Sequence, residues 1–266
     1  MRIGKILRKK RSNKKKVSKR EKMVLSLRKA LLPLAVVITT IFLFQLYKTV
    51  SELKVLGVKE IEIKGNHHLS EETILSITNI RRDNIFRIDL EYLRTKFMKS
   101  PWIKEALIRR EFPGTIKINL IERVPEAIVD YGDSFYLVDG EGVIIERLRD
   151  RRGHFLPVIT GIDLSESRLG ERSYSKGLLE GLTLFRFLKD KGIGIDDMEL
   201  VANKPDELTL NLAGRQIKVG YGNYQEKFNR LDEIDKELKR KGILASSIDV
   251  RFAGKVIVIP MAGGRL

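Results

Sequence analysis

Apolar residues form one unbroken run near the start of the chain and short alternating or helix-spaced segments after it. The unbroken run, residues 30–47, lies between Lys29 and Lys48 and contains no charged residue. At a rise of about 1.5 Å per residue it would span roughly 27 Å as a helix, close to the thickness of a bilayer's hydrocarbon core. A buried helix of a soluble protein would be expected to carry a polar stripe, which this run lacks. We therefore predict a transmembrane helix over residues 30–47, with Pro33 in its first turn.

After a linker, residues 48–57, the pattern changes to that of a small α+β domain over residues 58–125. The expected elements are a strand, two helices and a β-hairpin, over residues 58–66, 70–80, 89–100 and 102–129. Ser70 and Asp89 are suitable N-caps, and Pro113-Gly114 is a turn sequence between the two hairpin strands. The first helix is expected to bury one side, formed by Ile74, Leu75 and Ile77.

Residues 126–260 predict a second domain, a mixed β-sheet with two helices, followed by a short tail, residues 261–266. The expected strands cover residues 134–147 (a hairpin), 156–161, 198–202, 207–212, 215–220 and 246–260. The expected helices cover residues 173–191 and 223–242, where apolar residues recur every three or four positions. The fold class is therefore α+β, with one transmembrane helix preceding two domains.

Positive charge is concentrated in a tail, residues 1–29, which holds fourteen of the 51 Lys and Arg residues and one acidic residue. The rest of the chain is nearly neutral, with 37 basic and 34 acidic residues. Basic residues next to a span stay on the cytoplasmic side, so the tail is expected in the cytoplasm and the domains outside it. Nucleic-acid binding by the tail is an alternative interpretation. The orientation of the span in the membrane already explains these basic residues, so no nucleic acid is expected as a partner. Anionic lipid is a further expected partner of the tail.

Residue chemistry points away from catalysis. The chain has no cysteine, so the exported domains must be stabilised by core burial rather than disulfides. His67 and His68 are adjacent at a strand end, where neighbouring side chains diverge, and His154 stands apart in a charged loop. Sequence motifs of serine hydrolases, zinc peptidases, P-loops and dinucleotide sites are missing. We predict neither catalytic residues, nor a metal site, nor a cofactor.

The order of elements, with "SPWIKEALIRREFPGTIKINLIERVPEAIV" as its signature, resembles a POTRA domain of the FtsQ/DivIB family of single-pass bacterial cell-division proteins. The residues that carry this resemblance, each explicable by a structural role, are Pro101, Trp102, Arg109, Arg110, Pro113, Glu122, Arg123 and Pro125. The second domain resembles the β domain of the same family in its "YLVD" hairpin, its "PVITG" strand and its closing "IDVRF" strand. The final segment, "AGKVIVIPMAGGRL", fits the family less closely.

The resemblance implies a non-enzymatic assembly protein of the divisome, placed in the cytoplasmic membrane and enriched at the division septum. In this family the terminal β region engages an FtsB–FtsL pair, so the expected partner-binding residues are Arg251, Phe252, Gly254, Val256 and Val258. Arg251 would pair with a partner carboxylate, and Phe252 would be an apolar anchor. The alternative is that Val256 and Val258 are core residues of a closed sheet.

Two other classes of protein remain as alternatives. One is a POTRA-containing outer-membrane assembly or secretion factor, but the roughly 130 mixed residues after the POTRA-like segment do not resemble a membrane β-barrel. The other is a membrane-anchored envelope enzyme with an unrecognised site, which a deep pocket of convergent carboxylates would support.

Overall fold

The computed structural model describes residues 19–51, 56–78, 80, 84–196, 198–212 and 214–265. Helix α1, Lys19–Ser51, contains the predicted span. Its stretch Leu31–Thr49 is long and apolar enough to cross a membrane, and none of it is buried against the other residues that the structure describes. The helix begins well before residue 30, so Pro33 lies in its interior and our placement in a first turn was wrong. The predicted tail of residues 1–29 lies mostly outside the described residues.

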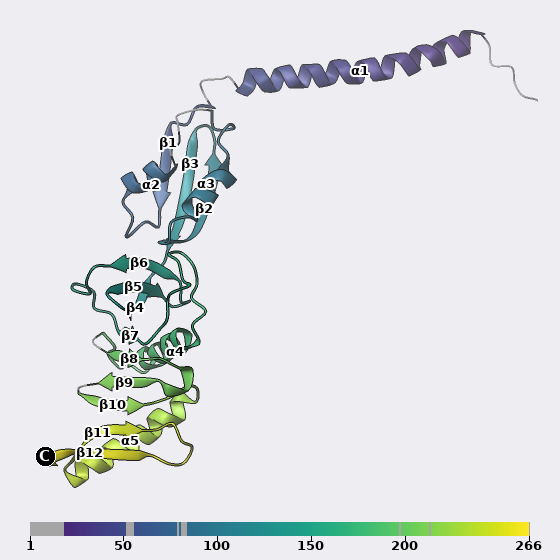
Figure 1. The fold of residues 1–266 in the computed structure, drawn as a ribbon. Helices are drawn as coiled ribbons and strands as arrows, with labels where there is room; N and C mark the ends of the chain where they lie inside the picture. Colours follow the sequence, from purple (N-terminus) through teal and green to yellow (C-terminus); the bar gives the residue numbers. More distant parts are fainter. Residues whose placement is uncertain are drawn as a thin grey trace, which may run out of the picture.

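The first unit, residues 56–122, has the predicted order of a strand, two helices and a hairpin (Figure 1). Its elements are β1 (Glu60–Lys64), α2 (Glu71–Thr78), α3 (Leu90–Phe97), β2 (Ile103–Glu111) and β3 (Thr115–Glu122). Strand β3 is central, parallel to β1 and antiparallel to β2. Alternate β3 residues Ile116, Ile118 and Leu120 are buried beneath the two helices, which gives this unit its own core.

The helices of the first unit begin where side chains satisfy free backbone N–H groups. The Ser70 hydroxyl accepts a hydrogen bond from the Thr73 N–H at 3.2 Å, and Asp89 Oδ1 accepts one from the Tyr92 N–H at 3.0 Å. Ile74 is fully buried, but Leu75 is 41% exposed, so its expected burial was wrong. One residue corresponds to about 100° around a helix, which turns Leu75 away from the core that Ile74 faces.

The second unit, residues 125–265, forms one nine-stranded sheet with two helices. Its strands are β4 (Pro125–Tyr131), β5 (Ser134–Asp139), β6 (Ile144–Leu148), β7 (Val158–Thr160), β8 (Glu199–Val201), β9 (Thr209–Leu212), β10 (Arg215–Lys218), β11 (Ile243–Asp249) and β12 (Ile257–Arg265). Helices α4 (Lys176–Asp190) and α5 (Tyr224–Lys241) follow β7 and β10. Strand β12 includes residues 261–265, which the sequence analysis assigned to a tail.

The strands lie in the order β12-β11-β10-β9-β8-β7-β4-β5-β6 (Figure 1). Helix α4 connects β7 to β8, and α5 connects β10 to β11. Each of these two strand pairs is parallel. Apolar residues of both helices share one core with the sheet. The helices therefore cover one face, and the sheet extends from the first unit at one end to β12 at the other.

Glu122, at the end of β3, fixes the turn that precedes α2. Its carboxylate accepts backbone hydrogen bonds from His67 (3.0 Å), His68 (2.6 Å) and Leu69 (3.0 Å). Burial raises the pKa of Glu122, but these hydrogen bonds outweigh it and hold the pKa below its ordinary value. The two adjacent histidines are thus placed by their backbone, and the His68 ring stacks on Trp102 with 3.5 Å between centroids.

Residues from the end of the first unit also contact the second. The indole N–H of Trp102 donates to Glu146 at 3.1 Å, and the ring packs on a small cluster that includes Ile128 and Leu137. Arg123, between the units, donates to the buried carboxylate of Asp139 at 2.5 Å. Because these contacts come from residues close to the connection between β3 and β4, they restrict rotation of one unit against the other.

The remaining motif residues of the first unit lie along the same strands and turns. Arg110 donates to the carbonyl oxygens of Ile85 (2.8 Å) and Ile88 (2.6 Å), which ties the loop before α3 to β2. Arg109 is exposed on β2 opposite Lys117. The prolines mark element ends: Pro101 precedes β2, Pro113 lies in the hairpin turn and Pro125 begins β4.

We predict that Glu122→Gln lowers the free energy of unfolding by about 1–2 kcal/mol at pH 7, because an amide cannot accept three backbone hydrogen bonds as a carboxylate does. The pKa of Glu122 is lower in the folded protein than in the unfolded chain. Its stabilisation is therefore complete above the unfolded value of about 4.3 and disappears as the pH falls through the folded value. Urea unfolding of the full chain in detergent, followed by the fluorescence of its one tryptophan, Trp102, measures the difference. A gap between wild type and variant that stays constant from pH 7 to pH 3 would contradict the assignment.

We predict that Arg123→Met destabilises the chain by about 3 kcal/mol, because it leaves the Asp139 carboxylate, 7% exposed, without its cation. The double variant Arg123→Met/Asp139→Asn should recover part of the loss, since Asn keeps an acceptor for the Val143 N–H that Asp139 now binds at 2.9 Å. Arg152→Ala is the matched control: Arg152 pairs with Asp150 but is 89% exposed, so solvent screens the pair and its loss should leave the free energy of unfolding nearly unchanged. Equal losses for Arg123→Met and Arg152→Ala in the same unfolding assay would show that the buried pair has no special role.

Candidate partner-binding edge

Strand β12 is one edge of the nine-stranded sheet and pairs on one side only, with β11. The two strands are antiparallel, with Ile248 opposite Val258 and Asp249 opposite Ile257. The other side of β12 is followed by no further strand among the described residues, so its backbone N–H and C=O groups face outward. Such groups are able to pair with a strand from another chain.

The two faces of β12 differ in what they contact. Val258, and Val256 just before the strand, are partly buried and pack against the core cluster that includes apolar residues of α5, but the sheet is open at β12 rather than closed as in the alternative. Ile257, Ile259 and Met261 alternate with them and are 40%, 53% and 44% exposed. The edge strand therefore combines a free backbone with an exposed apolar face.

The loop before β12 is held by a cation on α5. Arg230 Nη2 donates to the carbonyl oxygens of Val250 (3.0 Å) and Phe252 (3.2 Å), and its Nη1 pairs with Glu226 at 2.5 Å. Gly254 then reverses the chain with φ +66°, a left-handed conformation that favours glycine. These contacts fix Phe252, which is 48% exposed, beside the start of β12.

Arg251 is already paired within the chain. Its Nη2 donates to Asp249 Oδ2 at 2.8 Å, and its Nε lies 3.1 and 3.2 Å from the two carboxylate oxygens. Burial raises the pKa of Asp249, but the hydrogen bonds from Arg251 outweigh it and keep the pKa below its ordinary value; the same bonds raise the pKa of Arg251. Both groups are charged at neutral pH, and a partner carboxylate would have to share Arg251 with Asp249.

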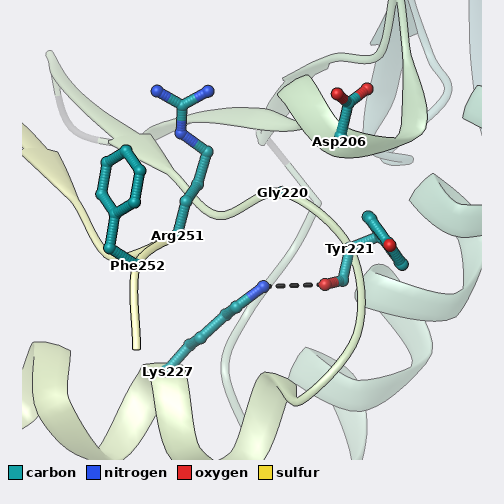
Figure 2. Close-up of a pocket in the computed structure, with 6 residues that line it drawn as sticks. All are labelled: Asp206, Gly220, Tyr221, Lys227, Arg251 and Phe252. Atoms are coloured by element: carbon teal, nitrogen blue, oxygen red, sulfur yellow. Dashed lines mark hydrogen bonds between the residues drawn. The ribbon is translucent and has the colours of Figure 1, made fainter. Parts of the chain in front are cut away.

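A hollow of about 240 Å³ adjoins Arg251 and Phe252 (Figure 2). Its other lining residues are Asp206, Gly220, Tyr221 and Lys227. The Lys227 ammonium donates to the Tyr221 carbonyl at 2.8 Å, and burial lowers its pKa, with Arg230 acting in the same direction. The hollow is small and open, and it offers two cations beside an aromatic ring rather than an arrangement of convergent carboxylates.

The five predicted partner-binding residues lie close together in the fold, but they do not share one surface. Arg251, Phe252 and Gly254 are on the exposed loop, whereas the side chains of Val256 and Val258 face the core. Sequence analysis missed the outward residues Ile257, Ile259 and Met261. Successive residues 256–259 are all apolar, so alternation alone did not show which set faces outward; the pairing of Ile248 with Val258 decides it.

Both units match known families. A family model described as "POTRA domain, FtsQ-type" matches residues 56–123, and one described as "Cell division protein FtsQ/DivIB, C-terminal" matches residues 127–251. The second match ends at Arg251, so the exposed edge strand lies beyond it. This boundary agrees with the looser resemblance of the final segment.

Curated relatives cover most of the chain. It is 32% identical to the cell division protein FtsQ of Geobacter sp. strain M21, over 81% of this chain and 80% of the relative. It is 33% identical to the FtsQ of Syntrophotalea carbinolica, over 77% and 74%, and 25% identical to the cell division protein DivIB of Clostridium tetani, over 76% and 78%. The resemblance to the FtsQ/DivIB family and the predicted α+β fold class are both confirmed. The chain belongs to the FtsQ/DivIB family of cell-division proteins.

Proposed function

We propose that this protein is a non-enzymatic, membrane-anchored divisome assembly protein whose β12 edge binds other division proteins, such as an FtsB–FtsL pair. The observation that carries the proposal is the one-sided pairing of β12 together with its exposed apolar face. Membership of a cell-division family supplies the context in which such an edge would be used.

Addition of a partner strand to β12 would satisfy both chemical features of the edge. Main-chain hydrogen bonds would supply affinity, while Ile257 and Ile259 would select apolar side chains at alternate positions of the partner. Pro260 has no N–H group, so the ladder would be interrupted there and would be most regular before it. The length of this strand makes an uncovered edge prone to unspecific association, which a bound partner would prevent.

Arg251 and Phe252 would contact the partner next to the added strand. Phe252 has an exposed ring that a partner side chain can cover, and Arg251 Cζ lies 5.6 Å from the centre of that ring. A partner carboxylate placed beside Phe252 would meet Arg251, whose guanidinium points away from Lys227 (Figure 2). Opposite charge at this position would orient the partner as well as attract it.

Anchoring by α1 would make modest contacts sufficient. Confinement of two proteins to one membrane raises their effective concentration, so a scaffold does not need high affinity in solution. We infer that the basic tail lies in the cytoplasm, where it suits anionic lipid, that both units lie outside the cytoplasm, and that the protein is enriched at the septum.

We predict that Ile259→Lys and Phe252→Ala each weaken binding of an FtsB-type peptide at least tenfold, about 1.4 kcal/mol, because each removes exposed apolar contact area at the edge. Binding is measured by titrating the labelled peptide with full-length protein in detergent micelles. Tyr174→Ala is the matched control, since Tyr174 is an aromatic residue of the same unit and 88% exposed.

The proposed binding site is wrong if the double variant Arg251→Glu/Phe252→Ala keeps its affinity for the peptide. It is also wrong if Tyr174→Ala weakens peptide binding as much as Phe252→Ala. Because Arg251 contacts Asp249, the thermal unfolding midpoint of every variant is recorded, and only variants that unfold within a few degrees of the wild type are compared. Ile259→Lys and Phe252→Ala alter half-exposed side chains, so they are expected to meet that criterion.

A further inference from the structure

Two phenylalanine rings are exposed together at one end of the first unit. Phe86 is 44% exposed and Phe112 is 59% exposed, and their ring centroids are 5.3 Å apart at an angle of 39°. Phe112 follows the end of β2 at the hairpin turn, and Phe86 lies in the loop before α3. Neither ring belongs to the core of the unit or to the β12 edge.

This aromatic pair is attached rigidly to the residues that follow the membrane helix. The Ile85 N–H donates to the Leu56 carbonyl at 2.8 Å, and the Lys59 N–H donates to the Gly114 carbonyl at 2.8 Å. Gly57 forms a bridge with Asn84, and Arg110 holds the Ile85 carbonyl from β2. The loop that carries Phe86 and the turn next to Phe112 are therefore both fastened to residues 56–59.

The connection to the membrane helix is short. The apolar stretch of α1 ends at Thr49 and the helix itself at Ser51. From Ser51 to Leu56 there are five Cα–Cα steps of about 3.8 Å, so covalent geometry limits the separation of these residues to about 19 Å. This limit holds whatever path residues 52–55 take. With α1 in a membrane, the end of the first unit that carries the aromatic pair is thus restricted to the neighbourhood of the bilayer surface.

Exposed cations flank the same end. Lys59 and Arg87 are both exposed, one beside the hairpin turn and the other next to Phe86. A headgroup layer offers phosphates to cations and a partly apolar region to aromatic rings, which is why aromatic and basic residues gather at membrane interfaces. A basic side chain near an anionic surface contributes about 1 kcal/mol.

We propose that Phe86 and Phe112, with Lys59 and Arg87, form a lipid contact that rests the first unit on the membrane that α1 crosses. The proposal depends on the membrane anchoring put forward above. Strands β2 and β3 run from this end to the contacts with the second unit, so resting this end on the bilayer fixes the height and direction at which the second unit and its β12 edge are held (Figure 1).

The chain has no cysteine, so single reporters are introduced without background. The full-length variants Glu60→Cys, at the aromatic end, and Lys99→Cys, at the opposite end of the same unit, each carry a bimane fluorophore on an exposed position. They are reconstituted in phosphatidylglycerol–phosphatidylethanolamine vesicles that contain lipid with a nitroxide on its headgroup. We expect at least twofold stronger quenching at position 60 than at position 99.

The substitutions Phe86→Ser/Phe112→Ser in the Glu60→Cys background should reduce quenching to the level at position 99, while flotation with the vesicles persists because α1 is intact. Phe155→Ser is the matched control: this ring is 79% exposed in the second unit, and its loss should leave quenching unchanged. An unchanged thermal unfolding midpoint shows that the double variant is folded.

Equal quenching at positions 60 and 99, or quenching that survives the double substitution, would overturn the lipid contact while leaving the anchoring intact. Shielding of position 60 from solvent in native membranes, without quenching in pure lipid vesicles, would indicate that a protein partner covers this end. That result would also overturn the lipid contact. Failure of the wild type to float with vesicles would instead contradict the anchoring itself.

Discussion

Our proposals for this protein depend on one interaction, the transfer of the α1 side chains from water into lipid. Every side chain from Leu31 to Thr49 is exposed, so no other residue that the structure describes shields this apolar surface from solvent. A bilayer would cover it, and the helix satisfies its own backbone hydrogen bonds while crossing. With such an anchor, function would depend on how the two units are positioned relative to the membrane surface.

The contacts between the two units fix how the second unit is placed relative to the first. Glu122 orders the turn before α2, Arg123 reaches a buried carboxylate in the second unit, and Trp102 contributes to a core cluster there. Together they join a small sheet next to the membrane helix to a nine-stranded sheet whose far edge is β12. The protein then resembles an arm that ends in a strand with one unpaired side, which suits the proposed assembly role.

Local patterns were enough to predict most elements and their order, because helix spacing, N-caps and turn residues are encoded over short distances. Ser70, Asp89 and the Pro113-Gly114 turn all act as expected. The errors arose where long-range packing decides. Leu75 lies just beyond the buried side of its helix, and the apolar run at 256–259 has an inner and an outer face only because β11 fixes its register. The roles of Glu122 and Arg123 depend on partners distant in the sequence.

The side of the membrane on which the two units lie is the most direct test of the central claim. Intact spheroplasts are treated with protease from outside, and fragments are detected through a tag at the N-terminus. The account predicts loss of both units and survival of a protected fragment ending shortly after α1, while lysed cells also lose the basic tail. A full-length chain that resists protease in intact spheroplasts and is cleaved only after lysis would contradict the placement of both units outside the cytoplasm.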